Sequence, residues 1–247
     1  MEKFCLVTPT HKAKITEVEH LMLKHSLNLH KNVNHFFCVP DNVDVSFLSE
    51  NFPESIILKM SSENFESLQS YNRLLLDSGF YRKFQGFTYL AILQLDSVLL
   101  KKIDSIIDMN FDYVGAPWRK NIRVSIFNHR MHGNNKRLMW LPYRNVQVGN
   151  GGLSIRRTES MIELTEKIIA TSFARDALSG YQNEDFVISY MCRKLNLKVP
   201  NPLLAESIFI EEYLSAKSHQ IEPYGYHALE KFDSEKYADL AKSLSVI

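Results

Sequence analysis

Short apolar runs alternate with amphipathic stretches along the first half of the chain. The runs at residues 4–8, 35–39 and 55–59 have the length and the β-branched and aromatic content that predict strands. Between the first two, residues 15–29 place apolar side chains at helical spacing, which predicts a helix; these side chains are Ile15, Val18, Leu21, Met22 and Leu29.

The most informative apolar run covers residues 88–95 and stops at the carboxylate of Asp96. A continuous apolar run of this length is typical of a central strand that is covered on both faces. Ligands of such sheets bind at the carboxyl ends of the strands, so Asp96 is a candidate binding residue. An isolated Asp in this position more often caps the turn that follows, and the segments downstream are what favour binding.

The remaining pattern extends the alternation of strands and helices. Ser61 or Ser62 can cap a helix that runs through Tyr71 to Ser78, with Gly79 as its stop signal. Three more elements are predicted: a helix near 101–108, a strand over 111–114 and a helix over 186–195. This order predicts an α/β fold with a mostly parallel central sheet flanked by helices.

Composition narrows the classes of protein that fit. The 247 residues suffice for one large α/β domain, and 45% hydrophobic with 23% charged residues is ordinary for a soluble globular protein. A net charge of +1 gives no case for nucleic acid as a partner. Three cysteines without a paired spacing, no run long enough to span a membrane and no signal peptide lead us to expect a cytoplasmic protein.

Residues 119–145 change character and carry most of the basic side chains of the middle of the chain. Without a clear period, they predict a long irregular insertion, which in a compact domain is usually functional or disordered. Their charge can meet phosphate groups or an anionic membrane surface, or it can simply face solvent. The basic side chains are Arg119, Lys120, Arg123, His129, Arg130, His132, Lys136, Arg137 and Arg144.

A glycine-rich segment, Gly149-Asn150-Gly151-Gly152, comes just before the predicted strand that begins near Leu153. Glycine allows a backbone to approach a ligand closely, so this segment can present amide groups to a sugar or a phosphate. It matches neither a dinucleotide-binding fingerprint nor a phosphate loop, and a tight turn is the plainer interpretation.

Two further sites carry titratable side chains. Asn183 can cap a helix whose first turn holds Glu184 and Asp185, where the helix dipole favours negative charge; the functional alternative is a general base. His227 lies among aromatic residues and a glycine, where a lone histidine is usually structural but can also bind a metal ion.

Taken in order, six short motifs give the chain a resemblance to a known family. The motifs are Tyr71-Asn72-Arg73, Gln94-Leu95-Asp96, Gly115-Ala116-Pro117-Trp118, Gly149-Asn150-Gly151-Gly152, Asn183-Glu184-Asp185 and Gly225-Tyr226-His227. From about residue 4 to residue 232 the chain resembles a bacterial family of GT-A-type nucleotide-sugar glycosyltransferases, formerly a domain of unknown function and found in surface-polysaccharide gene clusters. The resemblance implies one GT-A-like domain over 1–247, with a nucleotide-binding half (1–118), a basic loop insertion (119–145) and an acceptor and catalytic half (146–235).

The same resemblance implies where the donor binds. Gln94-Leu95-Asp96 stands in the place of the Asp-x-Asp signature that holds a divalent cation, Mn²⁺ or Mg²⁺, with His227 as a second ligand. Because Gln94 replaces the first Asp, a mechanism without metal, in which basic side chains neutralise the diphosphate, stays open. The residues implied in donor and nucleotide binding are Thr8, Thr10, His11, Lys12, Asp41, Arg73, Gln94 and Asp96.

The resemblance finally implies the reaction. Gly149 to Gly152 would shape the donor-sugar and acceptor side, and Asp185, with Glu184 beside it, would supply the base of an inverting hexosyltransferase. The sugar would pass from a UDP-linked donor to a hydroxyl of a surface glycan, such as an O-antigen of lipopolysaccharide or a capsule, or to a lipid-linked oligosaccharide. Contact with the inner membrane face would be weak and peripheral. Two alternatives are a non-catalytic nucleotide- or glycan-binding module and a sugar nucleotidyltransferase.

Overall fold

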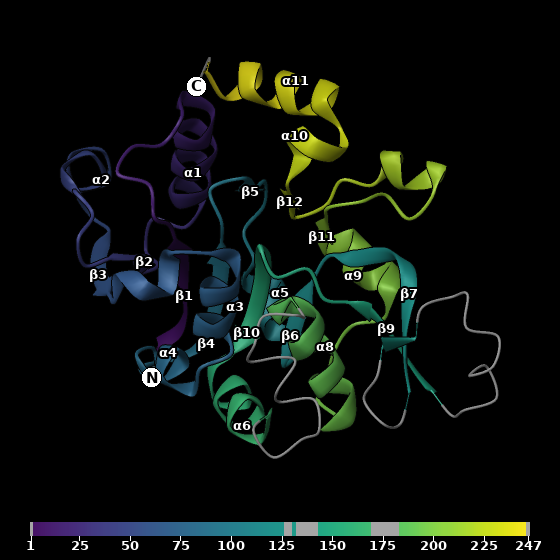
Figure 1. Cartoon of the computed structure of the whole chain (residues 1–247). Helices are drawn as coiled ribbons and strands as arrows, with labels where there is room; N and C mark the ends of the chain where they lie inside the picture. Colours follow the sequence, from purple (N-terminus) through teal and green to yellow (C-terminus); the bar gives the residue numbers. More distant parts are fainter. Residues whose placement is uncertain (1, 126–129, 132–142, 169–182, 246–247) are drawn as a thin grey trace.

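A computed structural model describes residues 2–125, 130–131, 143–168 and 183–245, and its centre is a six-stranded sheet (Figure 1). The strand order is β3-β2-β1-β4-β10-β6. The strands are β1 (Glu2–Pro9), β2 (His35–Pro40), β3 (Ile56–Met60), β4 (Phe87–Leu93), β6 (Tyr113–Gly115) and β10 (Leu153–Arg157). The strands predicted in the first half of the chain are thus confirmed.

Only β10 runs against the other strands of this sheet. It pairs antiparallel with both β4 and β6, with Ile155 opposite Ala91 on one side and Val114 on the other. β1 pairs parallel with β2 and with β4, and β2 pairs parallel with β3. The mostly parallel α/β sheet that the sequence predicts is therefore confirmed.

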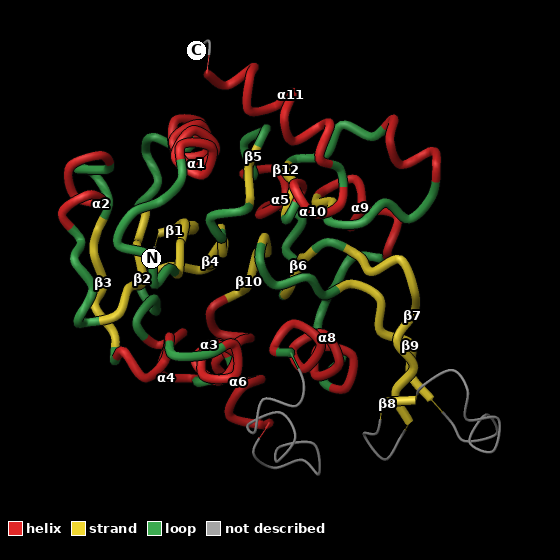
Figure 2. Tube along the Cα trace, turned by 45° about the horizontal axis from the view of Figure 1, so that its top comes forward, coloured by secondary structure: helices red, strands yellow, loops and turns green. Residues whose placement is uncertain are grey.

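Helices cover both faces of this sheet, as Figure 2 shows. Apolar side chains from α1 (Glu17–Leu29), α2 (Ser46–Asn51), α5 (Asp104–Asp108) and α9 (Pro202–Ile208) share one buried cluster with one face of the strands. A second cluster joins the opposite face to α3 (Leu68–Leu75), α4 (Ser78–Arg82), α6 (Thr158–Ile168) and α8 (Glu184–Lys194). Burial on both faces explains why the central strands are continuous apolar runs.

A small second sheet lies directly beyond the end of β4. β5 (Ser97–Leu99) begins one residue after Asp96 and pairs antiparallel with β12 (Gly225–His227), which pairs parallel with β11 (Phe209–Ile210). This register places His227 opposite Ser97, and so brings a residue from near the end of the chain next to Asp96. The motif at 94–96 and the motif at 225–227 therefore meet through strand pairing.

Three helices lie between and after the strands β11 and β12 of this sheet, the first between them and the other two after β12. They are η3 (Ala216–Gln220), α10 (Leu229–Phe232) and α11 (Ser234–Ser245). α11 packs against α1, and Met22 of α1 shares a third apolar cluster with Leu244 of α11. In the described part of the chain, no helix has the length and apolar character needed to cross a membrane.

The prediction of an irregular insertion over 119–145 is wrong for the residues that the structure describes. β7 (Pro117–Ser125) and β9 (Tyr143–Val148) pair antiparallel, and β8 (Arg130–Met131) adds to β7. The segment combines buried apolar side chains, such as Val124 and Val146, with exposed basic ones, such as Arg119 and Lys120. The basic residues His129, His132, Lys136 and Arg137 lie outside the described residues.

The single helix predicted between Ser61 and Ser78 is also wrong. A short 3₁₀ helix, η1 (Ser62–Phe65), comes first, and α3 begins after Ser67, whose side chain forms a reciprocal capping box with Ser70. The Asp77 side chain then caps α4, so Gly79 lies inside a new helix instead of ending the old one. Serine and aspartate side chains compete for backbone hydrogen bonds, and this breaks the segment into short pieces.

We expect Ser67→Ala to lower the free energy of unfolding by about 1 kcal/mol, because the start of α3 would lose its capping hydrogen bond. The matched control is Ser61→Ala: Ser61 occupies the same position before η1 but makes no capping hydrogen bond. Urea unfolding of both variants measures the difference. Equal losses in the two would show that the capping box does not stabilise α3.

Candidate functional site

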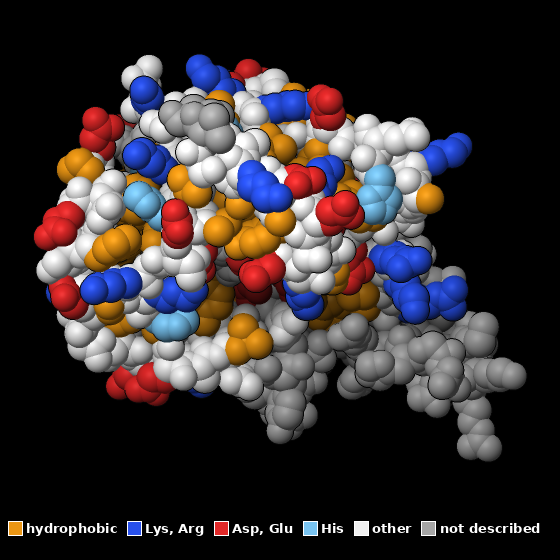
Figure 3. Space-filling model, turned by 90° about the horizontal axis from the view of Figure 1, so that it is seen from above, with side chains coloured by type: hydrophobic (Ala, Val, Ile, Leu, Met, Phe, Trp, Pro, Cys, Tyr) orange, Lys and Arg blue, Asp and Glu red, His pale blue; other side chains and the backbone are white. Residues whose placement is uncertain are grey.

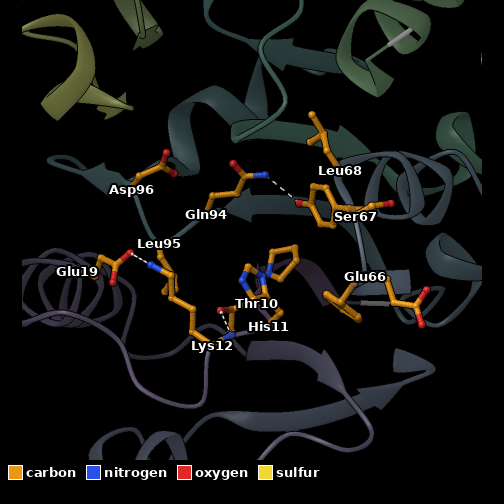
Figure 4. A pocket seen from close by; sticks show the side chains of 13 residues that line it. Thr10, His11, Lys12, Glu19, Glu66, Ser67, Leu68, Gln94, Leu95 and Asp96 are labelled. Atoms are coloured by element: carbon orange, nitrogen blue, oxygen red, sulfur yellow. Dashed lines mark hydrogen bonds and ion pairs between the residues drawn. The ribbon is translucent and has the colours of Figure 1, made fainter. Parts of the chain in front are cut away.

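A pocket of about 600 Å³ opens where β1 and β4 end, at the edge of the sheet where ligands of α/β folds bind (Figure 4). One wall comes from the segment after β1, a second from the segment between η1 and α3, and the base from the residues after β4. The lining side chains are Pro9, Thr10, His11, Lys12, Glu19, Phe65, Glu66, Ser67, Leu68, Tyr71, Gln94, Leu95 and Asp96.

The pocket combines an apolar wall with charged groups. Phe65, Leu68 and Tyr71 form the apolar side, and the exposed fraction of Leu68 is 64%, a high value for an aliphatic side chain. On the other side the Lys12 ammonium lies 2.6 Å from Glu19 Oε1. A lysine has three N–H donors, so Lys12 can donate to a ligand while it keeps this ion pair.

Gln94 links the base of the pocket to His227. Its Nε2 donates to the Tyr71 hydroxyl at 2.9 Å, and its Oε1 lies 3.3 Å from His227 Nε2. The same imidazole nitrogen lies 3.4 Å from Asp96 Oδ1. Strand pairing between β5 and β12 and the bond from the Ala228 N–H to the Asp96 carbonyl, 2.9 Å, hold the two segments together.

His227 stands between two carboxylates. Its Nδ1 lies 3.3 Å from Glu211 Oε1, on the side away from Asp96. Burial acts to lower the pKa of His227, but hydrogen bonds and charges of Asp96 and Glu211 outweigh burial and raise it to about 9. In turn, burial acts to raise the pKa of Asp96, and His227 holds that pKa below its usual value. The three groups therefore form one charged row leading inward from the pocket.

The glycine segment lies against this row, and its glycines are required by close packing. A Cβ on Gly152 would overlap His227 Nε2, and a Cβ on Gly151 would overlap Glu184 Oε1. A Cβ on Gly149 would overlap the Trp118 ring. None of the three has a left-handed φ. The glycines are therefore explained by close packing of side chains from three other elements on this backbone, and not by a tight turn.

Asn150 fixes the segment from within. Its Oδ1 accepts from the Gly152 N–H at 3.0 Å, and its Nδ2 donates to Glu211 Oε2. The Tyr113 hydroxyl donates to the carbonyls of Gly149 and Asn150. Glu211 is therefore shared between the glycine segment and His227.

Glu184 is held by a buried arginine. Arg156, whose side chain is 0% exposed, donates from Nη2 to Glu184 Oε1 at 3.0 Å. It also donates to the Gly151 carbonyl, the Ser154 hydroxyl and the Tyr81 hydroxyl. The Glu184 carboxylate is therefore engaged in a buried ion pair and balances the charge of a guanidinium that has no access to water.

Asp185, the next residue, has no such partner among the described residues. Its Oδ1 accepts from the N–H of Phe186, at 2.6 Å. Burial and the negative charge of Glu184 raise the pKa of Asp185 to about 8. A carboxyl group with a pKa near neutrality can exchange a proton with a substrate hydroxyl. Asn183 lies at the start of α8 as predicted, but its side chain makes no capping hydrogen bond.

Some of the predicted site residues do not reach the pocket. Thr8 is buried below it, where its hydroxyl bonds to His35 Nε2 at 2.9 Å. Asp41 is exposed at the end of β2 and does not line the pocket. Arg73 is exposed on α3; two residues after Tyr71, it points to the opposite side of the helix. The predicted residues that do line the pocket are Thr10, His11, Lys12, Gln94 and Asp96.

Three residues of the site were not identified from the sequence. Tyr71 was seen only as part of a motif, although it borders the pocket and holds Gln94. Arg156 is the first of two arginines at the end of β10, and the sequence does not indicate which of the two is buried. Glu211 follows a two-residue strand, β11, which has no readable period.

Asp96 and His227 are the predicted metal ligands, and the structure brings them together. Asp96 Oδ1 and His227 Nε2, 3.4 Å apart, are close enough to serve as neighbouring ligands of one ion. No group of three histidine, cysteine or acidic side chains capable of holding a metal occurs among the described residues. Phosphate oxygens and water would therefore have to complete the coordination, as is usual for Mg²⁺.

The chain belongs to a family that is described as a protein of unknown function (DUF5672), which matches residues 55–227. No curated protein matches the sequence. Mouse xyloside xylosyltransferase 1 in its apo form is similar in structure, with a TM-score of 0.57 and 13% identity over 91% of this chain and 97% of that one. The galactosyltransferase LgtC, in complex with donor and acceptor sugar analogues, gives a TM-score of 0.54 and 12% identity over 98% and 96%. The fold is thus that of GT-A glycosyltransferases.

We expect Gly152→Ala to lower the free energy of unfolding by about 1–3 kcal/mol, because the added methyl group collides with His227. The control is Gly86→Ala, where a Cβ meets nothing within 4 Å. That variant should be neutral or slightly stabilising, since alanine restricts the unfolded chain. Chemical denaturation compares the two, and similar stability in both would contradict the tight packing of the glycine segment on His227.

Proposed function

We propose that the protein is a glycosyltransferase that moves a sugar from a nucleoside diphosphate sugar to a hydroxyl group of a glycan. The observation that carries the proposal is the arrangement of the site. An open pocket at the carboxyl edge of a GT-A sheet connects, through Asp96 and His227, with carboxylates packed on a glycine segment. Figure 3 looks down on the molecule from above, and acidic side chains gather near the middle of this view beside lysine or arginine side chains.

The pocket suits the nucleoside diphosphate. Its apolar wall of Phe65, Leu68 and Tyr71 can pack against a base and a ribose, and Lys12 can donate to a phosphate. We propose that Mn²⁺ or Mg²⁺ is held by Asp96 and by His227 once its imidazole has lost a proton. When bound, the cation would neutralise the charge of the leaving diphosphate.

Asp185 is our candidate for the general base. As the acceptor oxygen attacks the anomeric carbon, Asp185 takes its proton, and the bond from that carbon to the diphosphate oxygen breaks. This is one displacement with inversion. Glu184, which is bound to Arg156 and packed on Gly151, is assigned to holding the glycine segment in place.

The resemblance to enzymes of surface-polysaccharide clusters supports the finer part of the proposal. We propose a UDP-linked donor, a surface-glycan or lipid-linked acceptor, and action in the cytoplasm, with weak contact to the inner membrane face through basic side chains. A non-catalytic module that binds nucleotide or glycan is the second candidate, and Gln94 in place of the first signature aspartate favours it. Incubation with a panel of nucleotide sugars separates the two, because only an enzyme releases free nucleoside diphosphate.

We expect Asp185→Asn to reduce turnover by about two to four orders of magnitude, the usual contribution of a general base. Donor affinity should change little, because Asp185 does not line the donor pocket. The wild-type rate should rise with pH and level off above about 8, the pKa of Asp185, since only the ionised carboxylate accepts a proton.

Steady-state kinetics of Asp185→Asn beside Glu184→Gln tests the assignment of the base. Glu184→Gln should cost less in turnover and more in acceptor affinity. If the losses are reversed, the two residues exchange roles. Losses of only a few-fold in both would mean that neither acid is the base.

We expect Asp96→Asn to weaken binding of a UDP-sugar in the presence of Mn²⁺ by roughly 10- to 100-fold, as for the loss of a charged partner. Asp41→Asn is the control, because Asp41 lies at the same sheet edge but outside the pocket. Calorimetry and thermal shifts, with and without Mn²⁺, measure the effect. If complete removal of metal does not affect donor binding, the proposed cation is wrong, and Lys12 and other basic groups must neutralise the diphosphate.

A further inference from the structure

A second pocket, of about 490 Å³, shares no lining residue with the nucleotide pocket. Its residues follow directly on residues that contact the glycine segment and His227. Arg119 follows Trp118, which packs on Gly149, and Glu212 follows Glu211, which contacts His227. The side chains that matter for its chemistry are Arg119, Glu212, Tyr213, His219 and Phe232.

One wall of this pocket is a pair of stacked rings. The rings of Tyr213 and His219 lie 3.8 Å apart with an angle of 28° between them. The Tyr213 hydroxyl donates to Asp233 Oδ2 at 3.0 Å, and the Lys236 ammonium lies 6.0 Å from the Tyr213 ring. Tyr213 is therefore fixed, while the His219 side chain remains 58% exposed. A flat ring held in place beside open space is a surface on which a sugar ring can lie.

The polar groups of the pocket select for a ligand that both donates and accepts hydrogen bonds. Arg119 has only donors and Glu212, as a carboxylate, has only acceptors. Among the described residues neither side chain takes part in an ion pair, so both are available to a ligand. Their opposite charges cancel, and a ligand with a charge of its own gains no net attraction from the pair. Neighbouring hydroxyl groups of a sugar satisfy both at once.

We propose that this second pocket binds the acceptor, and that the acceptor unit placed there is an uncharged sugar whose hydroxyls contact Arg119 and Glu212 while its ring packs on His219. The proposal rests on the proposed function, because it assigns the acceptor side of the same site. A uronic acid or a phosphorylated sugar gains no net attraction from this pair and loses part of the hydration of its charge in the pocket, so it binds less well.

The experiment compares neutral trisaccharides, namely maltotriose, cellotriose and β-1,4-galactotriose, with trigalacturonic acid as the charged counterpart. Saturation-transfer NMR on the full chain loaded with UDP and Mn²⁺ reports binding without turnover. We expect a neutral trisaccharide to bind, and Glu212→Gln, Arg119→Gln and His219→Ala each to weaken that binding by roughly tenfold. Glu222→Gln is the control, since Glu222 is 90% exposed and outside the pocket.

Kinetics then separates this proposal from the function on which it rests. The three variants should raise the KM for the neutral acceptor, leaving turnover and the slow hydrolysis of the donor by water unchanged. Suppose that the wild-type protein binds the trisaccharide but neither hydrolyses nor transfers the donor sugar. That result would refute the proposed glycosyltransferase activity and would still support glycan binding in the second pocket. Acceptor binding that is insensitive to all three substitutions, or stronger binding of trigalacturonic acid than of every neutral trisaccharide, would overturn the proposal.

Discussion

The buried contact between Arg156 and Glu184 is the constraint on which the rest of the site depends. A guanidinium without access to water costs several kcal/mol unless its donors are satisfied, and Arg156 satisfies them with groups from α4, the glycine segment, β10 and α8. Burial acts to lower the pKa of Arg156, but Tyr81 and Glu184 raise it, so the arginine stays charged. These four elements can therefore adopt only one arrangement relative to one another.

The same contact determines how charge is distributed among the acids nearby. Burial raises the pKa of Asp185, and the negative charge of Glu184, which is paired with Arg156, adds to this effect. His227 does the opposite for Asp96, whose pKa it lowers. Two acidic groups of one site thus have different pKa values: that of Asp96 lies below its usual value, and that of Asp185 is about 8. Burial acts to raise both, but Glu184 adds to this effect at Asp185, whereas His227 reverses it at Asp96.

The sequence predicted the sheet well because the signals there are local. Continuous apolar runs indicated β1, β2, β3 and β4, and the position of Asp96 at the edge of the sheet followed from the fold class. The errors arose where position depends on contacts distant in sequence. Arg73 sits in a motif, but the motif alone does not reveal which side of α3 it occupies. Glu211 enters the site only because β11 and β12 pair, and a two-residue strand leaves no period in the sequence.

The reversed direction of β10 has a consequence for how such a protein can diversify. In a parallel sheet only segments that follow a strand reach the ligand edge, but an antiparallel strand brings the segment that precedes it to the same edge. β4 and β10 thus deliver adjacent segments, and the Gln94 N–H bonds to the Gly152 carbonyl at 2.9 Å. β7 and β9 pair in a separate three-stranded sheet and not in this junction. Substitutions on that sheet can therefore alter what the protein recognises while the central sheet and the row of Asp96, His227 and Glu211 keep their geometry.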